Sequence, residues 1–154
     1  MNFFSNTRRR LFLRTLALTG LAGTALSARA GHSKSAVPAE LAHRVVFQIS
    51  DGEPKKWRAT FNNIKNVQAA LGVDQVGIEI VVHGPGIALL REESEQANLV
   101  LAAIQSGVRV LACLNTMRSM NLNADHMIAT IGYVEAGVVE IIERQAEGFA
   151  YIHS

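Results

Sequence analysis

The single cysteine of the chain, Cys113, is the residue whose type and position most clearly allow chemistry. It follows the apolar run 108–112 and precedes Asn115 and Thr116, two residue types that commonly cap a helix. A thiol between a strand and a helix start faces unpaired backbone N–H groups, which favour its thiolate. The sequence therefore predicts a reactive sulfur at Cys113. The alternative is a small buried hydrophobic residue, because free cysteines are among the most buried residue types.

A second group of candidate residues follows the apolar segment Val76–Val82, which has the character of a buried strand. His83 could orient or protonate a ligand at neutral pH, or it could cap its own turn through the backbone. Gly84 and Gly86 flank a proline and form a tight turn that lets the backbone approach a ligand closely. This turn is therefore predicted to border a binding site.

A third candidate, Asp51, comes directly after the apolar run 44–49. It could accept a proton, or it could cap the helix that begins after Gly52. Because ligands in open α/β sheets bind beyond the carboxyl ends of the strands, these three groups are expected to meet at one edge of the sheet. The predicted site has Cys113 as its reactive residue, with ligand-positioning residues His83, Asn115, Asp51, Gly84, Gly86 and Thr116.

Several other chemistries lack their sequence patterns. No His-Glu-x-x-His motif and no pair of histidines at ligand spacing is present, so no metal is predicted. The turn at residues 84–86 has neither the glycine spacing of a dinucleotide fingerprint nor the lysine of a phosphate loop, and no cofactor is predicted. A lone cysteine excludes an internal disulfide and leaves a buried thiol, an intermolecular partner or a reactive group.

Strand-like and helix-like segments alternate from His43 onward. Parallel strands joined by helical crossovers follow from this alternation, which predicts a three-layer α/β/α sandwich with a mainly parallel sheet of about five strands. The pattern does not give the strand order. The predicted strands are 44–49, 76–82, 108–112, 133–134 and 149–152. The predicted helices are 57–71, a helix after Ser94, short pieces at 115–120 and 125–128, and a last helix ending at Gly148. The helix after Ser94 is capped by this serine and has its apolar residues at Ala97, Val100, Leu101 and Ile104.

The first thirty residues have the three parts of a signal peptide. Residues 8–14 are arginine-rich and resemble the twin-arginine export pattern, and residues 11–26 are apolar. Ala28 and Ala30 form a small-x-small cleavage site. We therefore predict a signal peptide at 1–30, a linker at 31–42 and one α/β domain at 43–154, with the mature protein in the periplasm. The alternative is an uncleaved membrane anchor; every other apolar run is too short to span a membrane.

The formal charge of +2 comes from the signal segment. That segment holds five of the 15 Lys and Arg residues and no acidic residue, so the remainder has 10 basic against 13 acidic side chains. No basic patch interleaved with aromatic residues is visible, and nucleic acid is not a predicted partner.

The candidate site residues named above, taken with the segments around them, resemble the DsrE/DsrF-like sulfur-relay family. The resemblance covers roughly His43 to Ile152, and its most specific parts are the Gly-Pro-Gly turn at 84–86 and the Cys-x-Asn-Thr-Met stretch at 113–117. It implies a compact three-layer fold that assembles into homotrimers or homohexamers. It also implies that Cys113 carries sulfur as a persulfide between a donor and an acceptor, each a protein or a small sulfur compound.

Three functions are compatible with these observations. The first is an exported sulfur carrier that uses Cys113. The second is a non-catalytic oligomeric module that binds a small ligand at the strand ends, with Cys113 only lining the pocket. The third is a thiol redox sensor that forms a mixed disulfide with a partner.

Overall fold

The computed structural model describes residues 41–153. The predicted signal peptide and most of the predicted linker lie outside these residues. Among residues 41–153, no helix combines the length and the apolar character that crossing a membrane requires.

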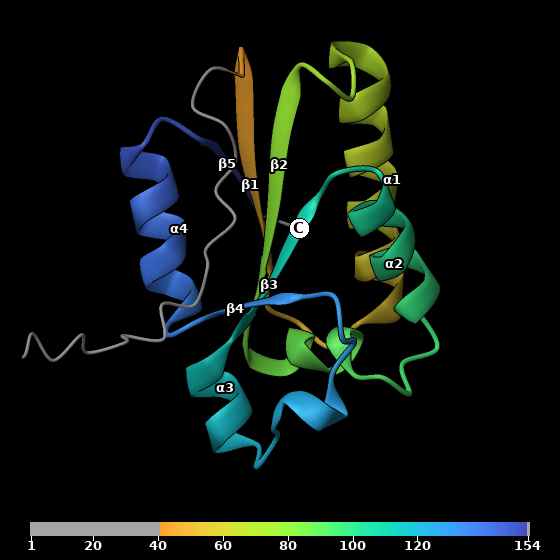
Figure 1. The fold of residues 1–154 in the computed structure, drawn as a ribbon, viewed down its shortest axis with the longest axis vertical. Coiled ribbons are helices and arrows are strands. Elements are labelled where there is room, and N and C mark those ends of the chain that lie inside the picture. The colour runs from red at the N-terminus through yellow and green to blue at the C-terminus, as the bar shows by residue number, and fades with distance from the viewer. Residues whose placement is uncertain (1–40, 154) are drawn as a thin grey trace, which may run out of the picture. The chain divides into compact units, whose positions relative to one another are not determined.

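The five predicted strands form a single all-parallel sheet in the order β4-β3-β2-β1-β5 (Figure 1). Parallel neighbours cannot be joined by hairpins, so every connection runs through a helical crossover, as the alternating pattern predicts. The strands are β1 (His43–Ile49), β2 (Val76–Val82), β3 (Arg109–Cys113), β4 (Gly132–Val134) and β5 (Ala150–His153).

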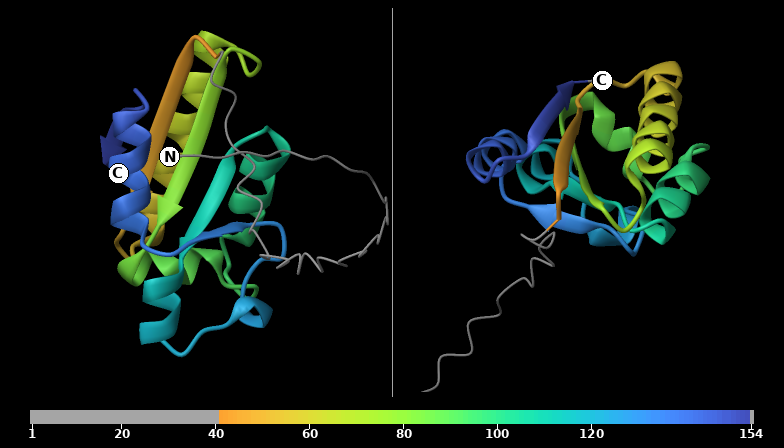
Figure 2. Two further views of the ribbon diagram at one scale, coloured as in Figure 1. Left: turned by 60° about the vertical axis from the view of Figure 1, so that its left-hand side comes forward. Right: turned by 90° about the horizontal axis from the view of Figure 1, so that it is seen from above.

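The helices cover both faces of the sheet, which confirms the predicted three-layer sandwich. Helices α1 (Pro54–Leu71) and α2 (Ala97–Gln105) lie on one face, and α4 (Gly137–Ala146) lies on the other (Figure 2). Helix α3 (Leu114–Ser119) continues directly from the end of β3 (Figure 1). Two short 3₁₀ helices, η1 (Gly84–Leu90) and η2 (Ala124–His126), complete the connections.

The larger core lies between the sheet and the α1/α2 layer. The apolar spacing of α1 places Trp57, Phe61 and Ile64 on one side, and all three are buried against the sheet as predicted. The helix ends at Gly72, whose φ of 90° suits glycine and whose N–H donates to the Gln68 carbonyl. A smaller core under α4 consists of Val46, Val81, Leu111, Val134, Ile141 and Phe149.

Helix α2 differs from its prediction at two points. It begins at Ala97 with Gln96 as N-cap, so the prediction that Ser94 caps it is wrong. The Ser94 hydroxyl and carbonyl instead accept from the N–H groups of Gln96 and Ala97 and close the turn before the helix. Leu101, predicted for the same apolar face as Val100, is 40% exposed, because this short helix buries Val100 and Ala103.

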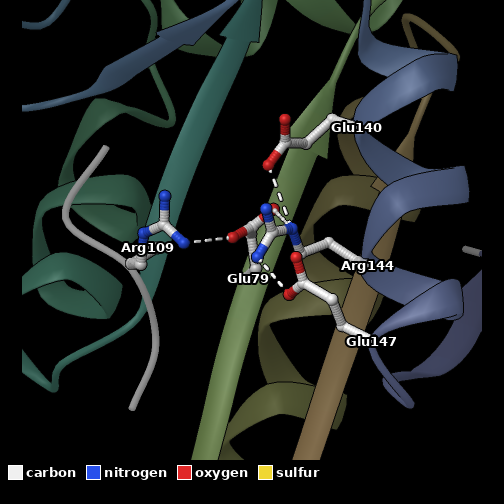
Figure 3. Close-up of polar contacts among 5 residues, drawn as sticks. All are labelled: Glu79, Arg109, Glu140, Arg144 and Glu147. Atoms are coloured by element: carbon white, nitrogen blue, oxygen red, sulfur yellow. Dashed lines mark hydrogen bonds and ion pairs between the residues drawn. The ribbon is translucent and has the colours of Figure 1, made fainter. Parts of the chain in front are cut away.

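A buried ion network joins the sheet to α4 (Figure 3). Glu79 on β2 is fully buried, and its Oε2 lies 2.6 Å from Arg109 Nη1 on β3. Its Oε1 lies 3.9 Å from Nε of Arg144 on α4. The guanidinium of Arg144 also contacts Glu140 at 3.0 Å and Glu147 at 2.6 Å. Glu140 lies on α4 and Glu147 is its C-cap, so it is the contact between Glu79 and Arg144 that links α4 to the sheet.

Candidate functional site

The carboxyl ends of four strands meet at one edge of the sheet. Ile49 pairs with Val82, Val82 pairs with Ala112, and Cys113 pairs with Val134. The segments that follow β1, β2, β3 and β4 therefore lie next to one another, at the edge where this type of sheet binds ligands.

Cys113 is both the last residue of β3 and the N-cap residue of α3. Its side chain is buried, with 4% of the residue exposed. The sulfur accepts a hydrogen bond from the N–H of Gly137, the first residue of α4, at 3.3 Å. It lies 4.0 Å from the carbonyl oxygen of Glu135. The thiol is thus placed between the starts of two helices.

The prediction that Asn115 or Thr116 caps α3 is wrong. The strand runs directly into the helix, so the N-cap position falls on Cys113 and no side chain caps the helix. The Asn115 side chain instead contacts Arg118, which also contacts the Glu135 carboxylate. The Asn115 N–H donates to the Glu135 carbonyl at 3.1 Å. Asn115 therefore joins α3 to the β4–α4 loop.

Thr116 joins α3 to the Gly-Pro-Gly turn. Its hydroxyl accepts a hydrogen bond from the N–H of Gly84 at 3.0 Å. Gly84 has a φ of 53°, which disfavours other residues. A Cβ on Gly86 would lie 2.8 Å from the carbonyl oxygen of Ile49. Both glycines are thus required for the turn to pack between β1 and α3, beside the thiol.

His83 borders the same group of residues. It is partly buried, and burial lowers the pKa of its imidazole, so the ring is neutral at neutral pH. Its Nε2 is buried and has no hydrogen-bond partner within the described part of the chain. Its Cβ and Cδ2 lie against the backbone of Gly137. His83, directly after β2, and Cys113, at the end of β3, therefore both contact Gly137.

Asp51 has a structural role at the start of α1. Its Oδ1 accepts from the N–H of Glu53 at 3.1 Å, and its Oδ2 lies 3.3 Å from Nζ of Lys56. Its carbonyl oxygen accepts from the Trp57 indole at 2.8 Å. The N-cap residue of α1 is Glu53, so the alternative prediction that Asp51 caps the helix is wrong. Asp51 instead organises the turn before the helix.

Two residues that contact the thiol, Glu135 and Gly137, were not among the predicted site residues. Glu135 lies in the connection between β4 and α4, and Gly137 is the first residue of α4. Local sequence pattern gives no strand order, and the neighbour relation of β3 and β4 is what brings these residues to Cys113. A glycine at the start of a helix, shortly after a strand, was the signal available in the sequence.

The environment of Cys113 favours its thiolate. Burial alone would raise the pKa of the thiol, but the Gly137 N–H, the Thr116 hydroxyl and the N–H groups of Thr116 and Asn115 stabilise the anion. The net result is a pKa below the ordinary value of a cysteine. Among the described residues, no group of three or more His, Cys, Asp or Glu side chains is arranged to hold a metal ion. The chemistry that this arrangement supports is nucleophilic attack by a thiolate.

This environment predicts the pH dependence of alkylation. Because the folded state lowers the pKa of Cys113, the thiolate persists to lower pH than in an unfolded chain, where the thiol titrates near about 8.5. The rate of iodoacetamide modification of folded protein should therefore reach half its maximum below the midpoint measured in urea. The pH midpoints are compared rather than the reaction rates, because the low solvent exposure of Cys113 slows alkylation at every pH. Equal midpoints, or a higher one in the folded protein, would contradict the expectation.

The family model that matches this chain is described as the DsrE/DsrF-like family, and the match covers residues 43–154. The chain is also similar to the solved structure of a protein of unknown function from Methanobacterium thermoautotrophicum. That likeness has a TM-score of 0.70 and 35% sequence identity, and it covers 73% of this chain and 99% of the other. No curated protein matched the sequence.

Proposed function

The chain belongs to the DsrE/DsrF-like family, and on that premise we propose that it is an exported sulfur carrier whose persulfide forms on Cys113. The observation that carries the proposal is the position of the thiol at the strand ends, with hydrogen bonds that stabilise its thiolate. A stabilised thiolate is the form that attacks sulfur.

Loading and discharge are two exchanges at one sulfur atom. The Cys113 thiolate attacks the outer sulfur of a persulfide or polysulfide donor, the donor S–S bond breaks, and the donor leaves as a thiolate. An acceptor nucleophile then attacks the outer sulfur, and Cys113 leaves as the thiolate. No oxidant or reductant is consumed. Because Cys113 is 4% exposed, the donor has to present a terminal sulfur, which suits a small or extended sulfur compound.

Binding of a small ligand without turnover is the second candidate. It is favoured by the buried Nε2 of His83, which has no hydrogen-bond partner among residues 41–153. A ligand with a polar group beside the thiol would satisfy that nitrogen. In this case Cys113 lines the pocket and stays unmodified.

The outer surface of α4 supports a homo-oligomer. Val138, Val139 and Ile142 are each at least half exposed, at 59%, 50% and 64%. Adjacent apolar side chains on one helix are more often covered by a partner than left in water. We therefore include assembly of several identical mature chains, beginning at Gly31 after export, in the proposal.

Mass spectrometry of protein purified from the periplasmic fraction tests the proposal. The denatured chain should begin at Gly31 and carry one or more extra sulfur atoms that a reductant removes, since a persulfide is reducible. Under native conditions the mass should be a multiple of that of one chain. An unmodified thiol together with a noncovalent ligand lost on denaturation would favour the binding module, and a native mass of one chain would exclude the oligomer.

A further inference from the structure

We propose that Gly137 is a positioning residue for the sulfur of Cys113. The missing side chain lets the first turn of α4 close against the ends of β2 and β3, and the main-chain N–H then holds the sulfur. The inference rests on the carrier function proposed above, because it explains how the carrying atom is held.

The contact between the two residues is direct. The N–H of Gly137 donates to Cys113 Sγ at 3.3 Å, and both residues are buried. Gly137 is the first residue of α4, where N–H groups have no partner inside the helix. Without the sulfur as acceptor, this buried donor would be left unsatisfied, so the contact benefits both groups.

Glycine is required here for space. Its φ is not positive, so its backbone conformation is open to other residues. A Cβ, however, would lie 3.2 Å from Val81 Cγ1, 3.2 Å from His83 Cβ and 3.3 Å from His83 Cδ2. These distances are shorter than ordinary van der Waals contact. Val81 is fully buried, and the Cβ of His83 is attached to the main chain directly after β2, so neither can easily move aside.

The last turn of α4 is linked to the sheet, which opposes a shift of the whole helix. There Nε of Arg144 lies 3.9 Å from Oε1 of the fully buried Glu79 on β2. A side chain at position 137 would therefore displace the first turn of the helix, which carries the N–H that reaches Cys113.

The first test uses the unaltered mature protein. The amide signals of Gly137 are followed by NMR as the pH is raised, and their shift should have the same midpoint as alkylation of Cys113. The titratable and charged groups on the segments around the thiol include His83, which lies beside Gly137, and the ion pair of Arg118 on α3 with Glu135 before α4. His83 titrates at lower pH because burial lowers its pKa, so its effect is separable. A Gly137 amide that does not respond to the thiol titration would overturn the inference.

The second test is a Gly137→Ala variant. Weakening a hydrogen bond to a charged sulfur should raise the alkylation midpoint of Cys113 by about one pH unit. The matched control is Gly52→Ala, because a Cβ there would meet only Pro85, at 3.5 Å and 3.7 Å. The control should leave the midpoint unchanged. A folded Gly137→Ala protein with the midpoint of the control would overturn the inference.

These readouts separate the inference from the carrier function. Both NMR and alkylation report on the thiol without any sulfur donor. If Gly137 controls the midpoint but the protein never accepts sulfur from polysulfide, the positioning role stands and the carrier function fails. If polysulfide loads the wild-type protein and the Gly137→Ala variant equally, and both have the same alkylation midpoint, the carrier function stands and the role of Gly137 fails.

Discussion

Replacing Glu79 by alanine is expected to lower the free energy of unfolding by about 3–5 kcal/mol, the usual cost of removing one partner from a buried ion pair. Glu79 is fully buried, and it contacts Arg109 at 2.6 Å and Arg144 at 3.9 Å. Both guanidinium groups have little solvent exposure, at 15% and 9% of the side chain. The variant would leave the positive charges of Arg109 and Arg144 in a buried site without the carboxylate that both contact.

Urea unfolding of the mature domain measures this effect. The matched control is Glu147→Ala, which removes another carboxylate from the same network. Glu147 contacts Arg144 at 2.6 Å but is itself 49% exposed, so solvent screens the contact and its removal should cost about 1 kcal/mol or less. A Glu79→Ala protein as stable as the Glu147→Ala protein would show that the network contributes little. If Glu79→Ala does not fold, the isosteric Glu79→Gln variant is used, and it should still be less stable than the control.

The ion network shows what the sequence could not predict. The segment Val76–Val82 was predicted as a buried strand, and the structure confirms it over these residues. A glutamate inside such a run gives no sign of its partners, which come from the neighbouring strand β3 and from α4, much later in the chain. Only the three-dimensional arrangement brings Glu79, Arg109 and Arg144 together.

The elements of the fold were more predictable than their arrangement. Apolar runs ended by glycine, and helical spacing with terminal glycines, are local signals, and they placed Cys113 at a strand end correctly. The order of the strands depends on contacts between distant segments. Because β4 lies beside β3, the β4–α4 loop contacts the thiol, and this is why Glu135 and Gly137 were missed.

The residues that cap the helices were also predicted incorrectly. Ser94 and Asn115 were both predicted as caps from residue type alone. The backbone decides which residue occupies the cap position, and a strand that runs without a break into a helix leaves that position to Cys113. The same short connection is what places the thiol beside α4.

Replacing Cys113 by serine is expected to abolish sulfur transfer while leaving the fold intact. The hydroxyl is nearly isosteric with the thiol, and it can still accept a hydrogen bond from the N–H of Gly137. Its oxygen stays protonated at neutral pH and forms no persulfide. Cys113 is the single cysteine of the chain, so no other thiol can take over.

Transfer from polysulfide to cyanide measures both half-reactions. Cyanide attacks the outer sulfur of the Cys113 persulfide, thiocyanate forms, and the cysteine thiolate is released. Mature protein loaded with polysulfide and freed of excess donor should yield up to one thiocyanate per sulfur atom carried, and the serine variant should yield none above buffer. His83→Gln is the matched comparison, since it changes a neighbouring group and keeps the thiol. Thiocyanate from the serine variant would mean that sulfur is held noncovalently. If neither the wild-type protein nor the serine variant is loaded, the carrier function fails and ligand binding beside His83, whose Nε2 is buried without a hydrogen-bond partner among residues 41–153, is the function left to test.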